Sequence, residues 1–117
     1  MNAKKYSELS VKDKEKLRFQ LYERDGRKCH YCGIEEEDFC KIWGETFYGG
    51  VKRGRRLEID HKNNDRRQNH LENLVLACSL CNMAKSDKFT HREFKKVGNV
   101  IREIWQQRKS SVLSVTA

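Results

Sequence analysis

The sequence predicts a small α+β domain in which helices flank a pair of short strands. Three observations lead to this prediction. The stretches "RRLEID" and "NLVLA" have the length and apolar content of strands, and a polar loop separates them. Helical patterns precede and follow these strands, and one pair of cysteines stands on each side of them. At 117 residues the chain is expected to form one domain, residues 1–117, which burial alone stabilises only marginally.

The first predicted element is an N-terminal helix over about residues 11–25. Ser10 is suited to the N-cap position, and Asp13 stands three residues later, where a side chain can complete a capping box. The pattern stops at Gly26, a typical residue after the last turn of a helix. Apolar side chains recur at near-helical spacing at Val11, Leu17, Leu21 and Tyr22.

The next features along the chain are the cysteines. Four of the five form two pairs, namely Cys29 and Cys32 in "CHYC", and Cys78 and Cys81 in "CSLC". A two-residue spacer lets both thiolates of a pair bind one ion, and two pairs complete the tetrahedral shell of a structural Zn²⁺ site. A redox CxxC motif would explain one pair but not two. Zinc closure contributes roughly 10 to 16 kcal/mol in zinc peptides, which so small a core needs.

Two residues near these motifs have simpler interpretations. Cys40 is expected to be a small buried residue, and a surplus thiol is the alternative. His30, inside the first cysteine pair, is at most an alternate metal ligand. Between the pairs, "EEEDFCKIW" predicts a short helix and "GETFYGGVKRGRR" a glycine-broken loop. The aromatic residues of this insertion are expected to pack a minor core, with insertion into a DNA groove as the alternative; they are Trp43, Phe47 and Tyr48.

The strands are followed by two further helices. "SLCNMAKSD" predicts a helix whose first turn holds the second cysteine pair, which completes a core of about residues 27–90. Thr90 and Glu93 form a capping box for a last helix over about residues 91–108. Its apolar stripe consists of Phe94, Val97, Ile101, Ile104 and Trp105. The residues after Lys109 are expected to form a loose tail.

Charge and hydropathy narrow the class of partner. Lys and Arg outnumber Asp and Glu by 25 to 17, and the net charge of +8 with a pI near 9.4 suits a polyanionic partner such as nucleic acid, with a plain solvated surface as an equal alternative. The sequence contains no apolar run long enough to span a bilayer, and "MNAKKYSELS" lacks the apolar core of a signal peptide. We therefore expect an intracellular, cytoplasmic protein that does not enter membranes.

Polar residues at the ends of the strands point to a specific family. Asp60 and His61 end the first strand, Asn73 begins the second, and Asn82 and Lys85 complete "CxxCNxxK". Together these motifs, over about Cys29 to Lys85, resemble the HNH nuclease family. The resemblance implies a ββα-metal fold, in which an antiparallel ribbon and one helix hold a single divalent metal, and it implies phosphodiester hydrolysis. The downstream run from "LACSLCNMAKSDKFT" through "VIREIW" is similar to a subgroup of small phage or bacterial members that includes a rare-cutting restriction enzyme.

The resemblance also assigns roles to these residues. His61 is expected to act as general base, because an unperturbed imidazole titrates near neutrality. Asp60 and Asn82 are expected to ligate the catalytic metal, and Asn73 to lock the loop and orient His61. Asn82 replaces the histidine that ends the family's name, and its carbonyl oxygen suits Mg²⁺ or Mn²⁺. Taken singly, each residue could be a turn former or a satisfied histidine; in register with two cysteine pairs they favour a nuclease.

The alternative function is a non-catalytic zinc-knuckle DNA-binding module, which would not need a base beside a metal ligand. Either function would use basic residues to contact the phosphates of DNA, which we expect to be double-stranded. The candidates are Lys52, Arg53, Arg55, Arg56, Lys62, Arg66, Arg67, Lys85 and Lys88, and a solvated position is the alternative for each. His70 and His91 are expected to be ordinary polar positions. The last helix could pack on its own domain or form a homodimer that places one site on each DNA strand.

Overall fold

The centre of the molecule is a two-stranded antiparallel sheet, as the sequence predicts. The computed structural model describes residues 3–43 and 56–116. Strand β1 (Glu58–His61) pairs with β2 (Leu74–Ala77), so that Glu58 lies opposite Ala77 and His61 opposite Leu74. The helices are α1 (Val11–Asp25), α2 (Phe39–Trp43), α3 (Ser79–Lys85) and α4 (His91–Thr116), and the short 3₁₀ turns are η1 (Tyr6–Glu8), η2 (Glu36–Asp38) and η4 (Leu71–Asn73).

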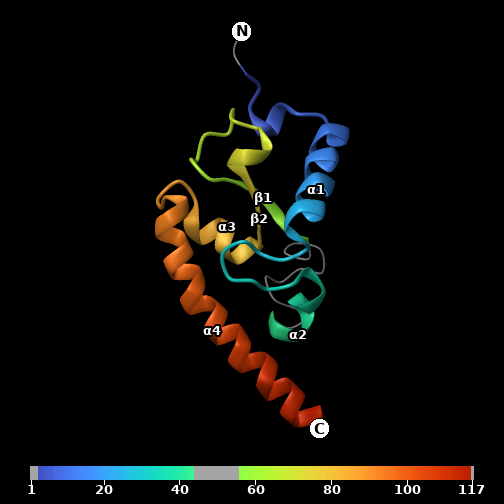
Figure 1. Cartoon of the computed structure of the whole chain (residues 1–117), viewed down its shortest axis with the longest axis vertical. Helices are drawn as coiled ribbons and strands as arrows, with labels where there is room; N and C mark the ends of the chain where they lie inside the picture. The colour runs from blue at the N-terminus through green and yellow to red at the C-terminus, as the bar shows by residue number, and fades with distance from the viewer. Residues whose placement is uncertain (1–2, 44–55, 117) are drawn as a thin grey trace.

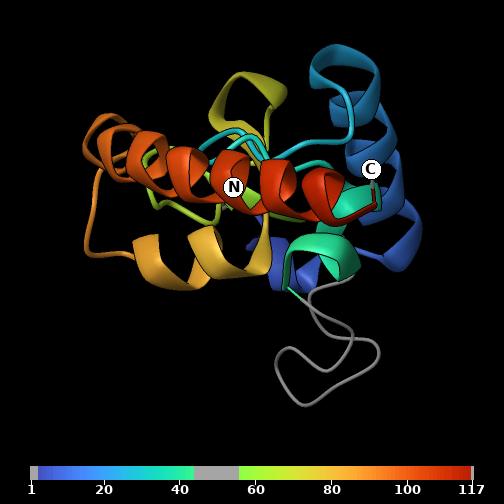
Figure 2. The ribbon, with the colours of Figure 1, turned by 90° about the horizontal axis from the view of Figure 1, so that it is seen from below.

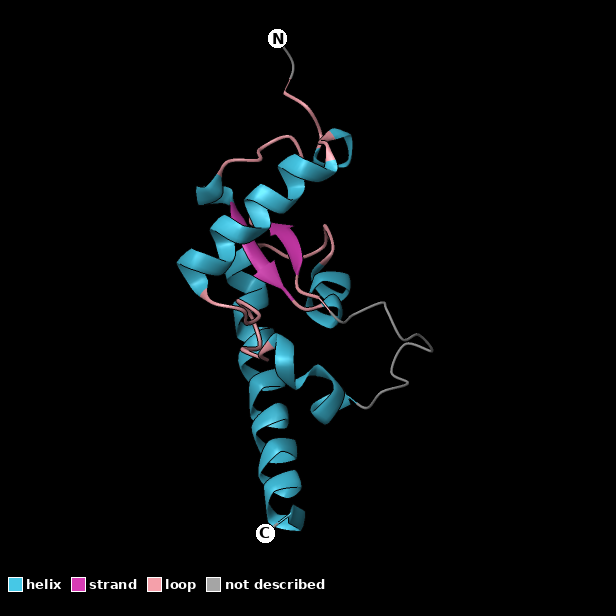
Figure 3. Cartoon of the chain, turned by 90° about the vertical axis from the view of Figure 1, so that its right-hand side faces the viewer, coloured by secondary structure: helices cyan, strands magenta, loops and turns pink. Residues whose placement is uncertain are grey.

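Helix α1 spans the residues predicted for it and lies across the strands (Figure 3). The Ser10 hydroxyl accepts a hydrogen bond from the backbone N–H of Asp13 at 3.0 Å. Gly26 ends the helix with a positive φ of 79°, a conformation that glycine adopts without steric cost. Leu21 is fully buried against the sheet, whereas Val11 is 78% exposed and lies outside the expected apolar face.

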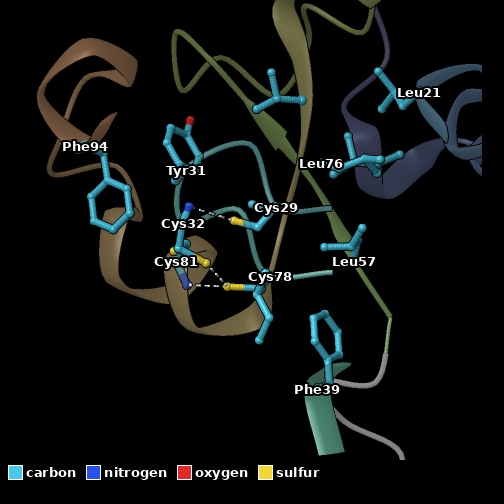
Figure 4. Close-up of a cluster of buried hydrophobic side chains, with 14 of the residues drawn as sticks. Leu21, Cys29, Tyr31, Cys32, Phe39, Leu57, Leu76, Cys78, Cys81 and Phe94 are labelled. Carbon is cyan, nitrogen blue, oxygen red and sulfur yellow. Dashed lines mark hydrogen bonds between the residues drawn. The ribbon is translucent and has the colours of Figure 1, made fainter. Parts of the chain in front are cut away.

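The core forms where α1, the sheet and the cysteine pairs meet (Figure 4). Every residue of β2 is buried, because this strand carries α1 on one side and the cysteine pairs on the other. The remaining large side chains of the core include Leu57, Tyr31, Phe39, Phe94 and Trp105. This arrangement confirms the small α+β domain, a zinc-compatible ββα unit with flanking helices.

Helix α4 begins at the predicted capping box. The Thr90 N–H donates to the Glu93 carboxylate at 2.9 Å, and the Glu93 N–H donates to the Thr90 hydroxyl at 3.1 Å. Gly98 brings α4 against the first cysteine pair, since a Cβ atom at this position would lie 2.4 Å from the Tyr31 carbonyl oxygen. The helix therefore needs glycine at this contact.

Two expectations for α4 were wrong. The helix continues to Thr116 instead of ending near residue 108, so the expected loose tail is helical. Its C-terminal end extends away from the sheet (Figure 1), and in the view from below α4 crosses in front of the other elements (Figure 2). The buried face contains Phe94, Gly98 and Trp105. Val97 and Ile104, expected on this face, are 38% and 43% exposed, because the close contact at Gly98 turns them outward with Val100.

The insertion between the cysteine pairs is described only in part. Trp43 stacks on Phe39, with ring centroids 4.7 Å apart, and meets Trp105 edge-on at 6.1 Å, which confirms a minor core for this residue. Phe47, Tyr48, Lys52, Arg53 and Arg55 lie outside the described residues, as do the surroundings of Cys40. Within residues 3–43 and 56–116, no helix combines the length and apolarity that a bilayer crossing requires.

Candidate functional site

The four paired cysteines converge on one point in the core. The sulfur atoms of Cys29, Cys32, Cys78 and Cys81 all lie within 4.8 Å of one another. Sulfur atoms around a tetrahedral Zn²⁺ with Zn–S bonds of about 2.3 Å are separated by about 3.8 Å. The distance between the Cys32 and Cys78 sulfurs is 3.7 Å, so the cluster fits zinc (Figure 4).

Local structure holds each pair in this arrangement. The first pair lies in a tight turn, where the Cys29 N–H donates to Ile34 O at 2.9 Å and Gly33 adopts a positive φ of 73°. The second pair starts α3, with Cys78 as the N-cap. In both pairs the backbone N–H of the second cysteine donates to the sulfur of the first, at 3.5 and 3.4 Å. Such N–H groups stabilise thiolates, which are the form that binds zinc.

Among the described residues, His30 contacts His91 and is not part of the sulfur cluster. Its Nε2 lies 2.7 Å from Nε2 of His91, and the two rings are stacked. Burial lowers the pKa of His91 to about 4, and the nearby charges of Lys62 and Lys95 act in the same direction. His91 was expected to be an ordinary polar position, so this imidazole pair is a contact that sequence reasoning missed.

Asp60 is buried at the edge of the sheet. Its Oδ2 accepts a hydrogen bond from the Tyr31 hydroxyl at 2.5 Å, and its Oδ1 lies 3.4 Å from Nζ of Lys85. Burial raises the pKa of the Asp60 carboxyl, whereas the hydrogen bond from Tyr31 and the charge of Lys85 act to lower it. Burial also raises the pKa of Tyr31, and the Asp60 charge adds to this effect. Tyr31 and Lys85 together hold the Asp60 carboxylate in one orientation.

Asn82 lies on α3 near Asp60 but has a different partner. Its Nδ2 donates to Oε1 of Glu58 at 2.8 Å. The carbonyl oxygen of the Asn82 side chain is not used in this hydrogen bond. Glu58 and Asp60 share one face of β1 because side chains alternate along a strand. A hollow of about 580 Å³ is lined in part by Glu58, Asp60, His61, Asn82, Ser86 and Asp87. The carboxylate oxygens of Glu58 and Asp60 and the carbonyl oxygen of Asn82 fit the ligand preference of Mg²⁺.

His61 ends β1 beside the same hollow and is only 6% exposed. Its Nε2 lies 2.7 Å from Oδ1 of Asn69, and the ring of Tyr6 packs edge-on against it at 5.7 Å. Sequence reasoning missed Asn69 and Tyr6. An asparagine in a polar loop reads as a turn residue, and Tyr6 lies far from the motif in the sequence.

Asn73 fastens the loop between the strands. Its Nδ2 donates to Asn63 Oδ1 and to Gln68 O, both at 2.9 Å, and its Oδ1 accepts from the Asn63 N–H at 3.2 Å. Within the described residues, the side chain of Asn73 has no hydrogen bond to His61. The contacts with which Asn73 was expected to lock the loop are therefore present. The side-chain contact to His61 that was also expected of Asn73 is made by Asn69.

Comparison with known proteins identifies this arrangement. No protein-family model matches the sequence, and no curated protein matches it. Among solved structures, the chain is similar to the rare-cutting HNH restriction endonuclease PacI, which is described for a mechanism of DNA perturbation. The match has 30% sequence identity and a TM-score of 0.59, and it covers 71% of this chain and 56% of that chain. By fold, this chain is similar to the HNH endonucleases.

The chain thus spans little more than half of the length of PacI. The HNH elements here are β1, β2 and α3, and the polar side chains of the motif lie along them. The HNH resemblance that the sequence predicts is therefore confirmed at the level of fold.

The basic residues around the HNH elements differ in exposure. Lys85 was expected at the DNA surface, but it is fully buried; its Nζ contacts Asp60, the His61 carbonyl and Asn64 Oδ1. The reason is helical periodicity, because Lys85 lies on the same face of α3 as Cys78 and Cys81. The exposed or half-exposed candidates within the described residues are Arg56, Lys62, Arg66, Arg67 and Lys88. Arg56 pairs with Glu15 at 3.2 Å, and Arg66 lies 3.9 Å from Asp87.

Proposed function

We propose that the chain is a metal-dependent DNA endonuclease that hydrolyses phosphodiester bonds. The observation that carries the proposal is the hollow beside β1, where a carboxylate, an imidazole and a helix amide meet on an HNH fold. A DNA-binding module has no use for a buried histidine next to a group of oxygen ligands. A hydrolase needs both.

His61 is the general base of the proposed reaction. It would take a proton from the attacking water while the phosphodiester is held in the hollow. Its position at the end of β1 is fixed by the Asn69 contact and by the Tyr6 ring, so the imidazole loses little freedom when DNA binds.

Asp60 and Asn82 would hold the catalytic Mg²⁺ or Mn²⁺, and Glu58 supplies a further carboxylate at the same hollow. When bound, the cation stabilises negative charge on the phosphate and on the departing oxygen. The protein contributes orientation, because Tyr31 and Lys85 fix the Asp60 carboxylate while Glu58 fixes the Asn82 amide.

Double-stranded DNA would bind through phosphate contacts from the exposed basic residues around this hollow. Arg66 lines the hollow itself, and Arg67 is exposed in the same loop. Arg53 and Arg55, which lie outside the described residues, are proposed to contact phosphates as well. The outward side chains of Val97, Val100 and Ile104 on α4 provide an apolar surface for a homodimer, which would bring one site to each strand.

A second function is favoured by one observation. Both oxygens of Asp60 already have partners in Tyr31 and Lys85, as they would in a non-catalytic zinc-knuckle DNA-binding module. Such a module would bind DNA without cleaving it.

The two functions are distinguished by incubating supercoiled plasmid with the zinc-loaded protein. We expect open-circular or linear DNA when Mg²⁺ or Mn²⁺ is added and intact plasmid when it is omitted. Zinc content is measured before and after, so that loss of activity is not caused by loss of zinc. Plasmid that is bound but uncut under all metal conditions would favour the module. The ratio of linear to open-circular product, followed together with the mass in solution, tests the dimer.

A further inference from the structure

We infer that Asn69 is a positioning residue that keeps the proton of neutral His61 on Nε2, so that Nδ1 is the basic nitrogen. The inference deepens the proposed function, since it names the atom of His61 that accepts the proton. It starts from the amide of Asn69, whose two ends have different partners.

The orientation of the Asn69 amide follows from the N-terminal segment. Its nitrogen lies 2.9 Å from the carbonyl oxygen of Lys4. A backbone carbonyl only accepts hydrogen bonds, so the NH₂ end of the amide must face Lys4. The Oδ1 end then faces His61, at 2.7 Å from Nε2.

The tautomer of His61 follows in turn. An amide oxygen also only accepts, so Nε2 of His61 must carry a hydrogen to make this contact. A neutral imidazole carries one N–H, which leaves Nδ1 with the lone pair. Without Asn69 the two tautomers would compete, and part of the protein would present N–H where a base is required.

The N-terminal segment holds this arrangement from outside the HNH motif. The backbone N–H of Tyr6 donates to Arg66 O at 2.8 Å, and the Tyr6 ring lies edge-on to the imidazole. Through these contacts Lys4 and Tyr6 connect the N-terminal segment to the loop between β1 and β2. His61, beside this segment, is only 6% exposed. The residues before α1 thus belong to the site, although they lie more than 50 residues from His61 in the sequence.

The first test measures the tautomer directly and needs neither DNA nor a catalytic metal. The ¹⁵N chemical shifts of the His61 ring are recorded in the full-length, zinc-loaded protein above pH 8. We expect a protonated Nε2 and an unprotonated Nδ1 in the wild type. Asn69→Leu should move both shifts toward averaged values, whereas Gln68→Leu, the same change at the exposed neighbour, should not. Asn69→Asp keeps an acceptor oxygen and should retain protonated Nε2.

Cleavage provides the second test. Asn69→Leu should lower kcat by roughly 10- to 100-fold, the range for losing a contact that positions a catalytic group, with KM for DNA unchanged. Asn69→Asp should recover at least part of this loss. Wild-type ring shifts in Asn69→Leu, or equal protonation of both nitrogens in the wild type, would overturn the inference. A wild type that has the expected tautomer but does not cleave DNA would instead contradict the proposed function alone.

Discussion

At the scale of single residues, the proposed role of each polar side chain in the site depends on whether that side chain is buried. His61, Asp60 and Asn82 could be selected from the sequence because acid, imidazole and amide stood in register with the cysteine pairs. Glu58 could have been selected as well, since it is two residues from Asp60 on an alternating strand. Tyr31 could not, because its contact with Asp60 joins residues distant in the chain. Asn69 could not, because an asparagine in a polar loop has the pattern of a turn residue.

Lys85 provides a test of the buried charge pair. Lys85→Met removes the cation and leaves the buried Asp60 carboxylate without it, which should lower the free energy of unfolding by about 3 to 5 kcal/mol. Lys88→Met, at an exposed position three residues away, should change it by less than about 0.5 kcal/mol. Both are measured by urea denaturation of the zinc-loaded protein. Equal stabilities for the two variants would show that Lys85 does not balance Asp60.

At the scale of elements, local patterns predicted where helices and strands begin better than where they end or what they touch. Ser10 and the Thr90–Glu93 box mark helix starts because capping is a local interaction. The end of α4 was predicted too early, because the serine and β-branched residues after Lys109 have low helix propensity. Val97 was assigned to the buried face because periodicity defines a stripe but not which side of it meets the domain.

Gly98→Ala tests the contact that determines which side of α4 packs on the domain. Gly98→Ala would place Cβ 2.4 Å from the Tyr31 carbonyl oxygen, a backbone atom that cannot move aside easily. We expect a loss of about 1 to 3 kcal/mol in stability, although alanine favours a helix over glycine by about 1 kcal/mol. Asn99→Ala, at the exposed neighbour, should be neutral or slightly stabilising. Gly98→Ala with unchanged or increased stability in thermal unfolding would mean that α4 does not pack here.

At the scale of the whole molecule, the chain combines a zinc-compatible core, a polar hollow and a net charge of +8. The charge and the cysteine pairs could be interpreted from the sequence because both depend on composition and spacing. Which basic residues are exposed could not be predicted in the same way. Lys85 has the same charge as Arg67, but the face of α3 on which it lies removes it from the surface.

The salt dependence of DNA binding tests the exposed arginines. The logarithm of the binding constant should fall linearly with that of the salt concentration, by about 0.9 per neutralised phosphate. Changing both Arg66 and Arg67 to Ala should flatten the slope by up to about 2. The control changes Lys12 and Lys16 to Ala, which removes the same charge from exposed positions of α1. If the two double variants have the same slope, these arginines are not the phosphate contacts.

The central claim is that His61 is the base of a metal-dependent nuclease, and the rate of plasmid cleavage under single-turnover conditions with Mg²⁺ tests it most directly. His61→Ala is compared with His70→Ala, which removes an exposed histidine from the loop that follows β1. We predict that His61→Ala lowers the rate at least about 100-fold while zinc content and DNA affinity stay near wild type, because only a positioned base is lost. His70→Ala should cleave at the wild-type rate. A His61→Ala protein that cleaves as fast as the wild type would contradict the claim.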